Sequence, residues 1–237
     1  MTKEKRKLFL IPLPIHEDGL PTIPQESIDI IHSLDHFIVE RARTARRFVS
    51  SLKHPRKIDD LIFEEIPEEK MTDREIDNLL SQFSSNGNIG LMSEAGMPAI
   101  ADPGNQYVRV AQKMGLHIIP LTGPSSIMMA LMASGLEGQR FAFHGYLSAK
   151  KTELPAQLRH LDQRADIDDA TQIWIEAPYR NKQILEAVER NIAPQRMFCI
   201  AAGIGQADGF VITKTVSDWR KRGWPEIHKV PAVFLVR

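Results

Sequence analysis

The chain has 237 residues, of which 43% are hydrophobic and 25% are charged, and this composition is ordinary for a globular protein with a buried core. Its 30 Lys and Arg residues balance its 30 Asp and Glu residues, so the formal net charge is zero. This balance excludes a protein that holds bare nucleic acid through a broad positive field. A local basic patch is still compatible with it. The best candidate is the segment with Arg41, Arg43, Arg46 and Arg47, although the sequence by itself favours a solvated helix face there.

Membrane and secretory segments are not expected. The apolar run from Ile127 to Ala133 is far too short to cross a bilayer. Residues 1–7 are basic but lead directly into a short β-like run, without the apolar region of a secretory signal. Cys199 is the single cysteine, which excludes an internal disulfide and suits a reducing compartment. The sequence therefore predicts a cytoplasmic protein.

In the first half of the chain, strand-like and helix-like segments alternate, which is typical of βαβ units and a parallel sheet. A Thr-x-x-Glu capping box at Thr72 and Glu75 predicts the start of one helix. Hydrophobic spacing predicts strands near 8–11, 37–39, 61–66, 89–92 and 117–120, and helices near 25–33, 42–52, 72–83 and around 108–111.

After an apolar helix near 126–134, the pattern becomes more mixed. Strands or helices are predicted near 141–143, 173–175, 184–188, 198–201, 210–212 and 233–236. The stretch 162–169 resembles a charged surface loop. We predict an α/β fold of two lobes, with a mostly parallel sheet and flanking helices in residues 1–123 and a smaller mixed sheet in residues 124–237.

Three loops at the ends of predicted strands carry more Gly and Pro than simple turns need. Pro12–His16 follows the first strand, and its prolines stiffen the backbone. It lacks the glycines of a dinucleotide-binding loop, and no Gly-rich phosphate-binding loop occurs elsewhere in the sequence, so a nicotinamide or NTP enzyme is not expected. Ser93–Gly104 follows a buried strand. There Glu94 could accept hydrogen bonds from a ligand, while Asp102 could equally cap the next helix.

The third loop, Thr122–Ile127, enters the first turn of a helix. Free amides and the helix dipole favour a carboxylate or another anion at such a position. An ordinary N-cap by Ser125 or Ser126 is the alternative. In open α/β sheets ligands collect beyond the carboxyl ends of the strands, so the three loops together predict a binding site there.

In this order the loops resemble those of the tetrapyrrole methylase superfamily, S-adenosylmethionine-dependent methyltransferases built from two α/β lobes. Within it the motifs are most similar to the small-subunit rRNA methyltransferase I group, which methylates a ribose 2′-hydroxyl. The likeness runs over residues 8–236. The matching stretches are Ser93–Gly104, Leu121–Ser126, Arg140–Lys150 and Glu176–Arg180.

The resemblance implies S-adenosylmethionine as cofactor, folded in a cleft between the lobes, and a homodimer that acts on rRNA of the small ribosomal subunit. A metal site is not expected, because His16 beside Glu17 and Asp18 lacks the ligand spacing of a zinc site. The residues that would surround the donor by this resemblance are Pro14, Ile15, Ser93, Glu94, Ala95, Gly96, Met97, Thr122, Ser125, Ser126, Ile127, Ala177, Ala201, Gly203, Ile204, Pro231 and Ala232.

The departures from the family pattern fall where an acceptor would be recognised. The family's Pro-Ile-Gly-Asn is Pro14–Glu17 here, and its Glu-Asp-Thr-Arg keeps only the outer pair, Glu40 and Arg43. Ala201–Gln206 replaces a stretch that carries two charges and a lysine. The acceptor-side candidates are His16, Glu40, Arg43, Glu176 and Arg180, although Glu40 with Arg43 and Glu176 with Arg180 could instead form ion pairs.

The sequence thus predicts an S-adenosylmethionine-dependent methyltransferase whose acceptor is a ribose 2′-hydroxyl of small-subunit rRNA. The donor prediction depends on loops that match the family well, and the acceptor prediction on motifs that have diverged. Two alternatives stay open: a methyltransferase for a small molecule such as a tetrapyrrole, and a non-catalytic donor-binding protein. The sequence identifies no catalytic base.

Overall fold

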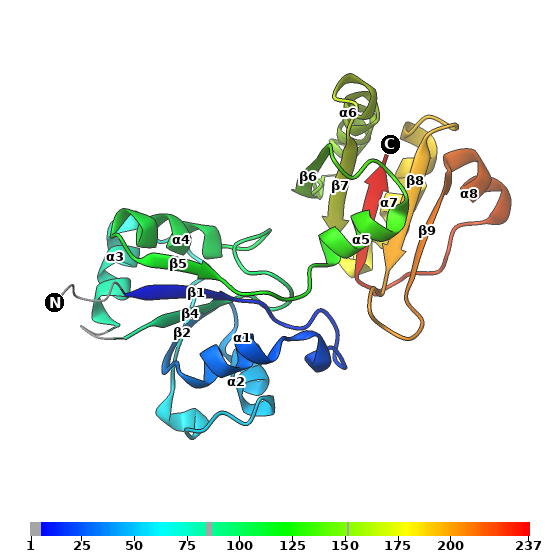
Figure 1. Cartoon of the computed structure of the whole chain (residues 1–237). Coiled ribbons are helices and arrows are strands. Elements are labelled where there is room, and N and C mark those ends of the chain that lie inside the picture. Colours follow the sequence, from blue (N-terminus) through cyan, green and yellow to red (C-terminus); the bar gives the residue numbers. More distant parts are fainter. Residues whose placement is uncertain (1–5, 84–86, 151) are drawn as a thin grey trace. The chain divides into compact units, whose positions relative to one another are not determined.

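The computed structural model describes residues 6–83, 87–150 and 152–237, and the chain divides by its packing into two compact units, Met1–Ser125 and Ser126–Arg237 (Figure 1). Most of the basic segment at 1–7 lies outside the described residues.

The first unit contains a five-stranded sheet in the order β3-β2-β4-β1-β5, and every neighbouring pair of strands is parallel. This confirms the parallel sheet that the alternating pattern predicts. Its strands are β1 (Lys7–Ile11), β2 (His36–Val39), β3 (Ile62–Glu65), β4 (Ile89–Met92) and β5 (His117–Pro120). Its helices are α1 (Gln25–His32), α2 (Ala42–Ser51), α3 (Asp73–Gln82) and α4 (Gly104–Lys113), with short 3-10 turns at Leu20–Thr22 and Ile58–Asp60.

Helices cover both faces of this sheet, as Figure 1 shows. Because successive side chains of a strand point to opposite faces, each strand contributes to two cores. Phe9 and Ile11 of β1 pack in the cluster that includes α1 and α2 residues, whereas Leu8 packs with residues of α3 and α4. Burial on both faces explains why the inner strands β1, β2 and β4 are nearly continuous apolar runs.

The predicted capping box at the start of α3 is present. The Thr72 hydroxyl accepts a hydrogen bond from the Glu75 amide at 3.3 Å, and the Glu75 carboxylate accepts one from the Thr72 amide at 2.7 Å. The two contacts satisfy backbone donors that have no partner within the helix, and so determine where α3 begins.

The second unit contains a five-stranded mixed sheet in the order β6-β7-β10-β8-β9, in which β6 and β7 are parallel and the other pairs are antiparallel. This confirms the mixed sheet predicted for the second half. Its strands are β6 (Phe141–Tyr146), β7 (Thr171–Glu176), β8 (Met197–Ala202), β9 (Phe210–Thr215) and β10 (Ala232–Val236). Its helices are α5 (Ser126–Ser134), α6 (Leu154–Ile167), α7 (Asn181–Asn191) and α8 (Val216–Arg222), with a 3-10 turn at Pro178–Arg180.

Two hydrophobic clusters lie on the two faces of the mixed sheet. Residues of α6, α7 and α8 pack around Trp174, Phe198 and Phe234, whose rings stack with centroids 5.7–6.0 Å apart. The second cluster combines α5 with the alternate strand residues, among them Cys199. Cys199 is fully buried, and burial raises the pKa of its thiol to about 11, which agrees with an unreactive thiol.

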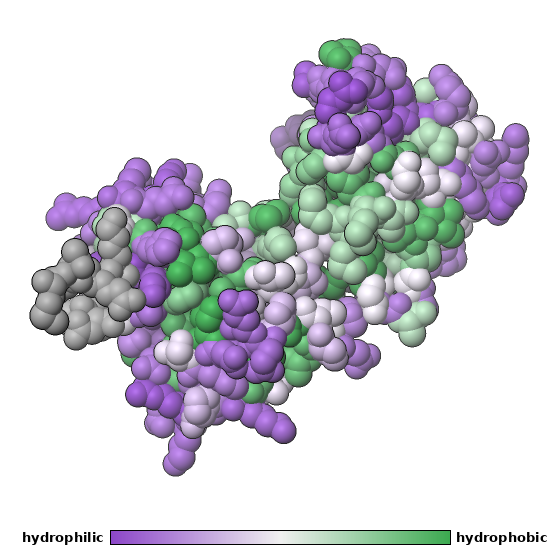
Figure 2. Space-filling view, viewed as in Figure 1, coloured by the Kyte–Doolittle hydropathy of each residue, from purple (hydrophilic) through white to green (hydrophobic). Residues whose placement is uncertain are grey.

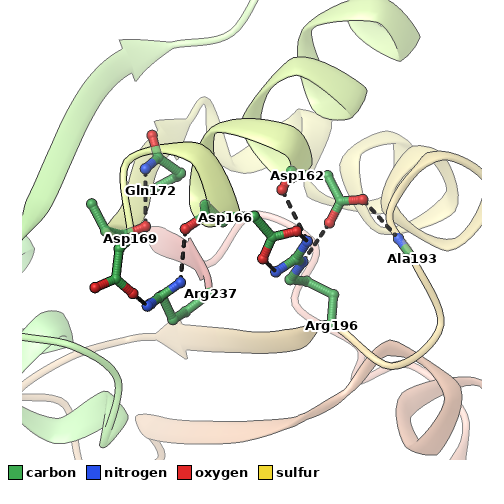
Figure 3. A network of polar contacts seen from close by, with 9 residues as sticks. Asp162, Asp166, Asp169, Gln172, Ala193, Arg196 and Arg237 are labelled. Atoms are coloured by element: carbon green, nitrogen blue, oxygen red, sulfur yellow. Dashed lines mark hydrogen bonds and ion pairs between the residues drawn. The ribbon is translucent and has the colours of Figure 1, made fainter.

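The prediction of a surface loop at 162–169 is wrong, because α6 continues to Ile167. Its apolar residues Leu158, Leu161 and Ala165 recur at helical spacing and face the core. The acidic residues stand on its hydrophilic outer face (Figure 2), where arginines from other elements pair with them. Figure 3 shows that Arg196 donates to both Asp162 and Asp166, at 2.6 and 2.7 Å. The charges that suggest a loop are thus the outer stripe of an amphipathic helix.

No helix in the described ranges combines the length and the apolar character that a bilayer crossing requires.

Candidate functional site

The loops that follow β1 and β4 are joined to each other. β1 and β4 are parallel neighbours with Ile11 opposite Met92, so both loops leave the same edge of the sheet. Leu13 and Gly96 then exchange two backbone hydrogen bonds, of 2.9 and 3.0 Å. Gly96 has φ +68°, a conformation that glycine adopts without strain.

The chain continues from these two loops to opposite faces of the sheet. α1 packs in the cluster on one face and α4 in the cluster on the other. Adjacent strands whose connections diverge in this way form a topological switch point, where open α/β sheets bind their ligands. The first two of the predicted loops therefore meet at a place that the topology favours for binding.

Asp102 organises the long loop after β4. Its Oδ1 accepts hydrogen bonds from the amides of Ala99, at 3.0 Å, and Gly104, at 2.7 Å. Gly104 is the first residue of α4, so Asp102 contributes to capping this helix, as the alternative reading of the sequence had it. Ala99 and Ala101 have φ +66° and +63°, a strained backbone that these contacts hold in place. Burial raises the pKa of Asp102.

Replacing Asp102 by Ala is expected to lower the free energy of unfolding by about 1–3 kcal/mol, because two backbone amides lose their acceptor. Asp102→Asn keeps an acceptor oxygen and should lose less. Since burial raises the pKa of Asp102, the folded protein binds its proton more tightly, and this group's contribution to stability falls as the pH rises through the folded pKa. Urea unfolding followed by far-UV circular dichroism at several pH values measures both effects. Equal midpoints for Asp102→Ala and the wild type would contradict this role.

A pocket of about 400 Å³ opens in the first unit beside the joined loops. It contains several predicted site residues, from the loops after β1 and β4: Pro14, Ile15, His16, Glu94 and Ala95. The remaining wall comes from Leu13, Glu17 and Leu20 and from α2 through Thr44, Arg47, Phe48 and Ser51.

The α2 side of this pocket was missed as a binding surface by the sequence analysis. The signal was present in the spacing, because Thr44, Arg47, Phe48 and Ser51 recur every three or four residues and therefore share one side of the helix. Hydrophobic spacing predicts the helix near 42–52 and the arginines indicate a basic segment, but neither pattern identifies this side of the helix as a binding surface.

Two candidate carboxylates, Glu40 and Glu94, lie next to each other although 54 residues separate them in the chain. The Glu40 carboxylate accepts a hydrogen bond from the Glu94 amide at 3.0 Å, and the Thr44 hydroxyl donates to the Glu94 carboxylate at 3.4 Å. Burial, with smaller effects of the Asp102 and Glu94 charges, raises the pKa of Glu40. Its carboxylate is thus a stronger base than that of an exposed glutamate.

The basic segment of α2 is only partly neutralised. Arg41 pairs with Glu65 and Glu68, at 3.2 Å each, and so does not point to a ligand. Arg46 pairs with Asp59 at 2.5 Å and lies over a phenylalanine ring. Arg43 and Arg47 are exposed, and among residues 6–83, 87–150 and 152–237 neither has a hydrogen-bonding or ionic partner. Of the four arginines in this candidate segment, two are therefore neutralised within the unit and two are not.

The third loop packs against the first. A Cβ atom on Gly123 would lie 2.2 Å from Cγ of Pro12, so only glycine allows this close approach. The Thr122 carbonyl accepts a hydrogen bond from the Ser27 hydroxyl of α1 at 3.2 Å. The loop ends at Ser125, the last residue of the first unit, and α5 of the second unit begins at Ser126.

The donor-side candidates of the second unit gather at one end of the mixed sheet. Ala232 of β10 is paired with Glu176 of β7 on one side and with Ala202 of β8 on the other. The Gly203 amide then donates to the Pro231 carbonyl at 2.9 Å. The candidates at or next to this row are Ala177, Ala201, Gly203, Ile204, Pro231 and Ala232, and Ile127 of α5 packs in the same hydrophobic cluster as Ala201 and Ile204.

Glu176 and Arg180 form the internal ion pair that the sequence left open. Their Oε1 and Nη1 atoms are 3.2 Å apart, and the Glu176 side chain is only 1% exposed. The same oxygen accepts the Ala177 amide at 2.8 Å, while Arg180 donates to the Ser148 carbonyl at 2.9 Å. Burial raises the pKa of Glu176, and the positive charge of Arg180 opposes this effect. The pair thus connects the turn after β7 to the loop after β6.

In the described part of the chain, no three His, Cys, Asp or Glu side chains come together in a way that could hold a metal ion.

Three relatives of similar sequence share one name. A Bacillus subtilis protein called ribosomal RNA small subunit methyltransferase I is 31% identical over 194 residues, which cover 80% of this chain and 62% of that protein. Relatives of the same name from Vibrio cholerae and Escherichia coli O157:H7 are 32% and 25% identical, over 73% and 95% of this chain and 56% and 69% of their own lengths. No family model matches the chain.

The fold is shared with two solved methyltransferases. The crystal structure of the methyltransferase CobJ covers 99% of this chain and 94% of its own chain, with a TM-score of 0.61 and 15% identity. Uroporphyrin-III-C-methyltransferase from Thermus thermophilus covers 97% of this chain and 93% of its own, with a TM-score of 0.55 and 14% identity. The chain spans about six-tenths of the length of its Bacillus relative.

These comparisons confirm the resemblance that the loop motifs indicate. The two sheets with their flanking helices form the tetrapyrrole methylase fold, and in sequence the chain is similar to proteins named ribosomal RNA small subunit methyltransferase I.

Proposed function

We propose that this chain is an S-adenosylmethionine-dependent methyltransferase that methylates a ribose 2′-hydroxyl of small-subunit rRNA. The name and the sequence similarity of the relatives support methylation of small-subunit rRNA, and the loop motifs support the donor and the ribose acceptor. The observation that carries it is the junction of Leu13 and Gly96, which holds two family-like loops together beside a pocket at the switch point of the sheet.

The walls of this pocket fit the donor. Pro14, Ile15 and Ala95 offer apolar surface for the nucleoside part, and the exposed Glu94 carboxylate complements the positive charge of a sulfonium and an amino group. When bound, the donor supplies an electrophilic methyl group for an in-line displacement. The residues of the pocket contribute by holding donor and acceptor in line, which accounts for much of the rate of such transfers.

A ribose hydroxyl must lose its proton during the transfer, so the site needs a base. Among the acceptor-side candidates Glu40 has the suitable chemistry, because burial raises its pKa and its position is set by the Glu94 amide. Glu176 is enclosed by its contacts with Arg180 and the Ala177 amide, and so is less suited to accept a proton from a substrate. His16 lines the pocket and is the second candidate.

The proposal includes further predictions from the sequence. Residues 1–123 would bear the acceptor side and the first donor loops, and residues 124–237 the remaining donor contacts at the row of Glu176, Ala232 and Ala202. The protein would be a cytoplasmic homodimer. Light scattering of the purified protein measures the dimer directly, and a monomer at micromolar concentration would exclude it.

Methyl transfer from labelled S-adenosylmethionine tests the function. Purified protein is given small ribosomal subunits from a strain that lacks this gene, free rRNA, or uroporphyrinogen III, and ribose methylation is mapped in any labelled RNA. Label at a ribose of the small subunit is expected. Label in the tetrapyrrole alone would support a small-molecule enzyme, and donor binding without transfer a binding protein. No donor affinity at millimolar concentration would contradict all three.

Glu94→Gln tests the donor site itself. We expect donor affinity to fall roughly tenfold, because a charge-assisted contact is replaced by a neutral one. Glu186→Gln is the matched control, since Glu186 is exposed on α7 in the second unit, outside the pocket. Titration calorimetry with S-adenosylmethionine measures both variants. Equal affinities for the two would remove Glu94 from the donor site.

A further inference from the structure

We infer that the side of α2 that carries Arg47, together with Arg43, binds the backbone phosphates of a single-stranded RNA acceptor, while the loops after β1 and β4 hold the donor. This inference rests on the proposed function and names the surface of the first unit that recognises the acceptor.

Charge is the first argument. A chain with a net charge of zero can bind RNA only through local positive groups. Arg41 and Arg46 are held by carboxylates of the same unit. Arg43 and Arg47 are exposed and, among the described residues, without a partner. They are four residues apart on one helix, so they lie on neighbouring turns of the same face and can contact successive phosphates.

The shape of the pocket is the second argument. Arg47 belongs to its wall, between Thr44 and Ser51, whose hydroxyls can donate to phosphate or sugar oxygens. Leu20 and the small exposed part of Phe48 add an apolar surface against which an unpaired base can pack.

The distribution of charge within the pocket gives an orientation. The carboxylates of the pocket, Glu17 and Glu94, come from the loops after β1 and β4, whereas Arg47 comes from α2. A phosphate is therefore attracted to the α2 side and repelled from the loop side. Ribose hydroxyls can donate to the carboxylates, and the 2′-hydroxyl is the group by which a protein distinguishes RNA from DNA.

The test compares Arg47→Gln and the double variant Arg43→Gln/Arg47→Gln with Arg46→Gln. Arg46→Gln is the control because it removes the same charge from the same helix. The Arg46 side chain is already paired with Asp59 and lies over the ring of Phe63. Fluorescence anisotropy measures the affinity of the full-length protein for a labelled mixed-sequence RNA oligonucleotide over a range of KCl concentrations. Melting curves establish that each variant is folded.

Arg47→Gln should weaken RNA binding roughly tenfold at low salt, and each lost phosphate contact should reduce the slope of log K against log salt by about 0.7. Arg46→Gln should change affinity by less than about threefold. Donor affinity, measured in parallel, should be the same in the wild type and in Arg46→Gln, because Arg46 is not part of the pocket.

The two proposals fail in different ways. A wild-type protein that binds no S-adenosylmethionine contradicts the proposed function, whatever happens with RNA. A wild type that binds the donor contradicts the inference if it has no affinity for the oligonucleotide, or if Arg47→Gln and Arg46→Gln have the same affinity and the same salt dependence. Equal binding of DNA and RNA of one sequence would contradict the orientation of the ribose toward the carboxylates.

Discussion

Replacing Arg180 by Met is expected to lower the free energy of unfolding by about 3–5 kcal/mol, because it leaves the Glu176 carboxylate buried without its counter-charge. The Arg180 contact with the Ser148 carbonyl is lost as well. All three tryptophans of the chain lie in the second unit, so tryptophan fluorescence during urea unfolding reports on the unit that carries the pair.

The pH dependence distinguishes loss of the ion pair from loss of packing. Burial already raises the pKa of Glu176, and removing Arg180 takes away a charge that lowers it. The folded state then binds the proton more tightly than the unfolded state does, so stability decreases as the pH rises through the folded pKa. Arg180→Met should therefore be much less destabilising in acid than at pH 8.

Two controls accompany this variant. Glu176→Gln/Arg180→Met removes the buried charge and should recover part of the lost stability. Arg164→Met breaks a more exposed pair with Asp168 and should cost less than about 1 kcal/mol. A loss for Arg180→Met that is the same at every pH would mean that the ionised carboxylate is not the cause.

Replacing Gly123 by Ala is expected to be the second large effect. The new Cβ atom would lie 2.2 Å from Cγ and 2.5 Å from Cβ of Pro12, and the rigid proline ring cannot turn away. Overpacking of this kind costs up to about 3 kcal/mol, and it moves the loop after β5 away from the loop after β1. Donor affinity should therefore fall roughly tenfold together with stability.

The measurement for Gly123→Ala is far-UV circular dichroism in urea, because the first unit has no tryptophan. Gly138→Ala is the control, since an added Cβ there meets no atom within 4 Å and its φ is not positive. We expect Gly138→Ala to unfold at nearly the wild-type urea concentration. If the two variants behave alike, the contact between Gly123 and Pro12 is not needed for the stability of the first unit.

Much of the fold is predictable because it depends on periodicity and on short-range chemistry. Thr72 and Glu75 are three residues apart, so the start of α3 can be read directly from the chain. The parallel sheet follows from short apolar strands that alternate with amphipathic helices. The prediction of a surface loop at 162–169 is wrong because it depends on distant residues. The acidic side chains of this stretch are paired with Arg196 and Arg237, which lie much later in the chain.

The order of the loops along the chain was sufficient for the resemblance to methyltransferases, since a motif of consecutive residues needs no tertiary information. The packing of the folded chain was needed for everything that depends on distant partners. Glu40 meets the Glu94 amide across 54 positions, and Glu65 and Asp59 neutralise Arg41 and Arg46 but not Arg47. Spacing shows which residues share a helix face, whereas Coulomb and hydrogen-bond energies depend on distances that exist only after folding.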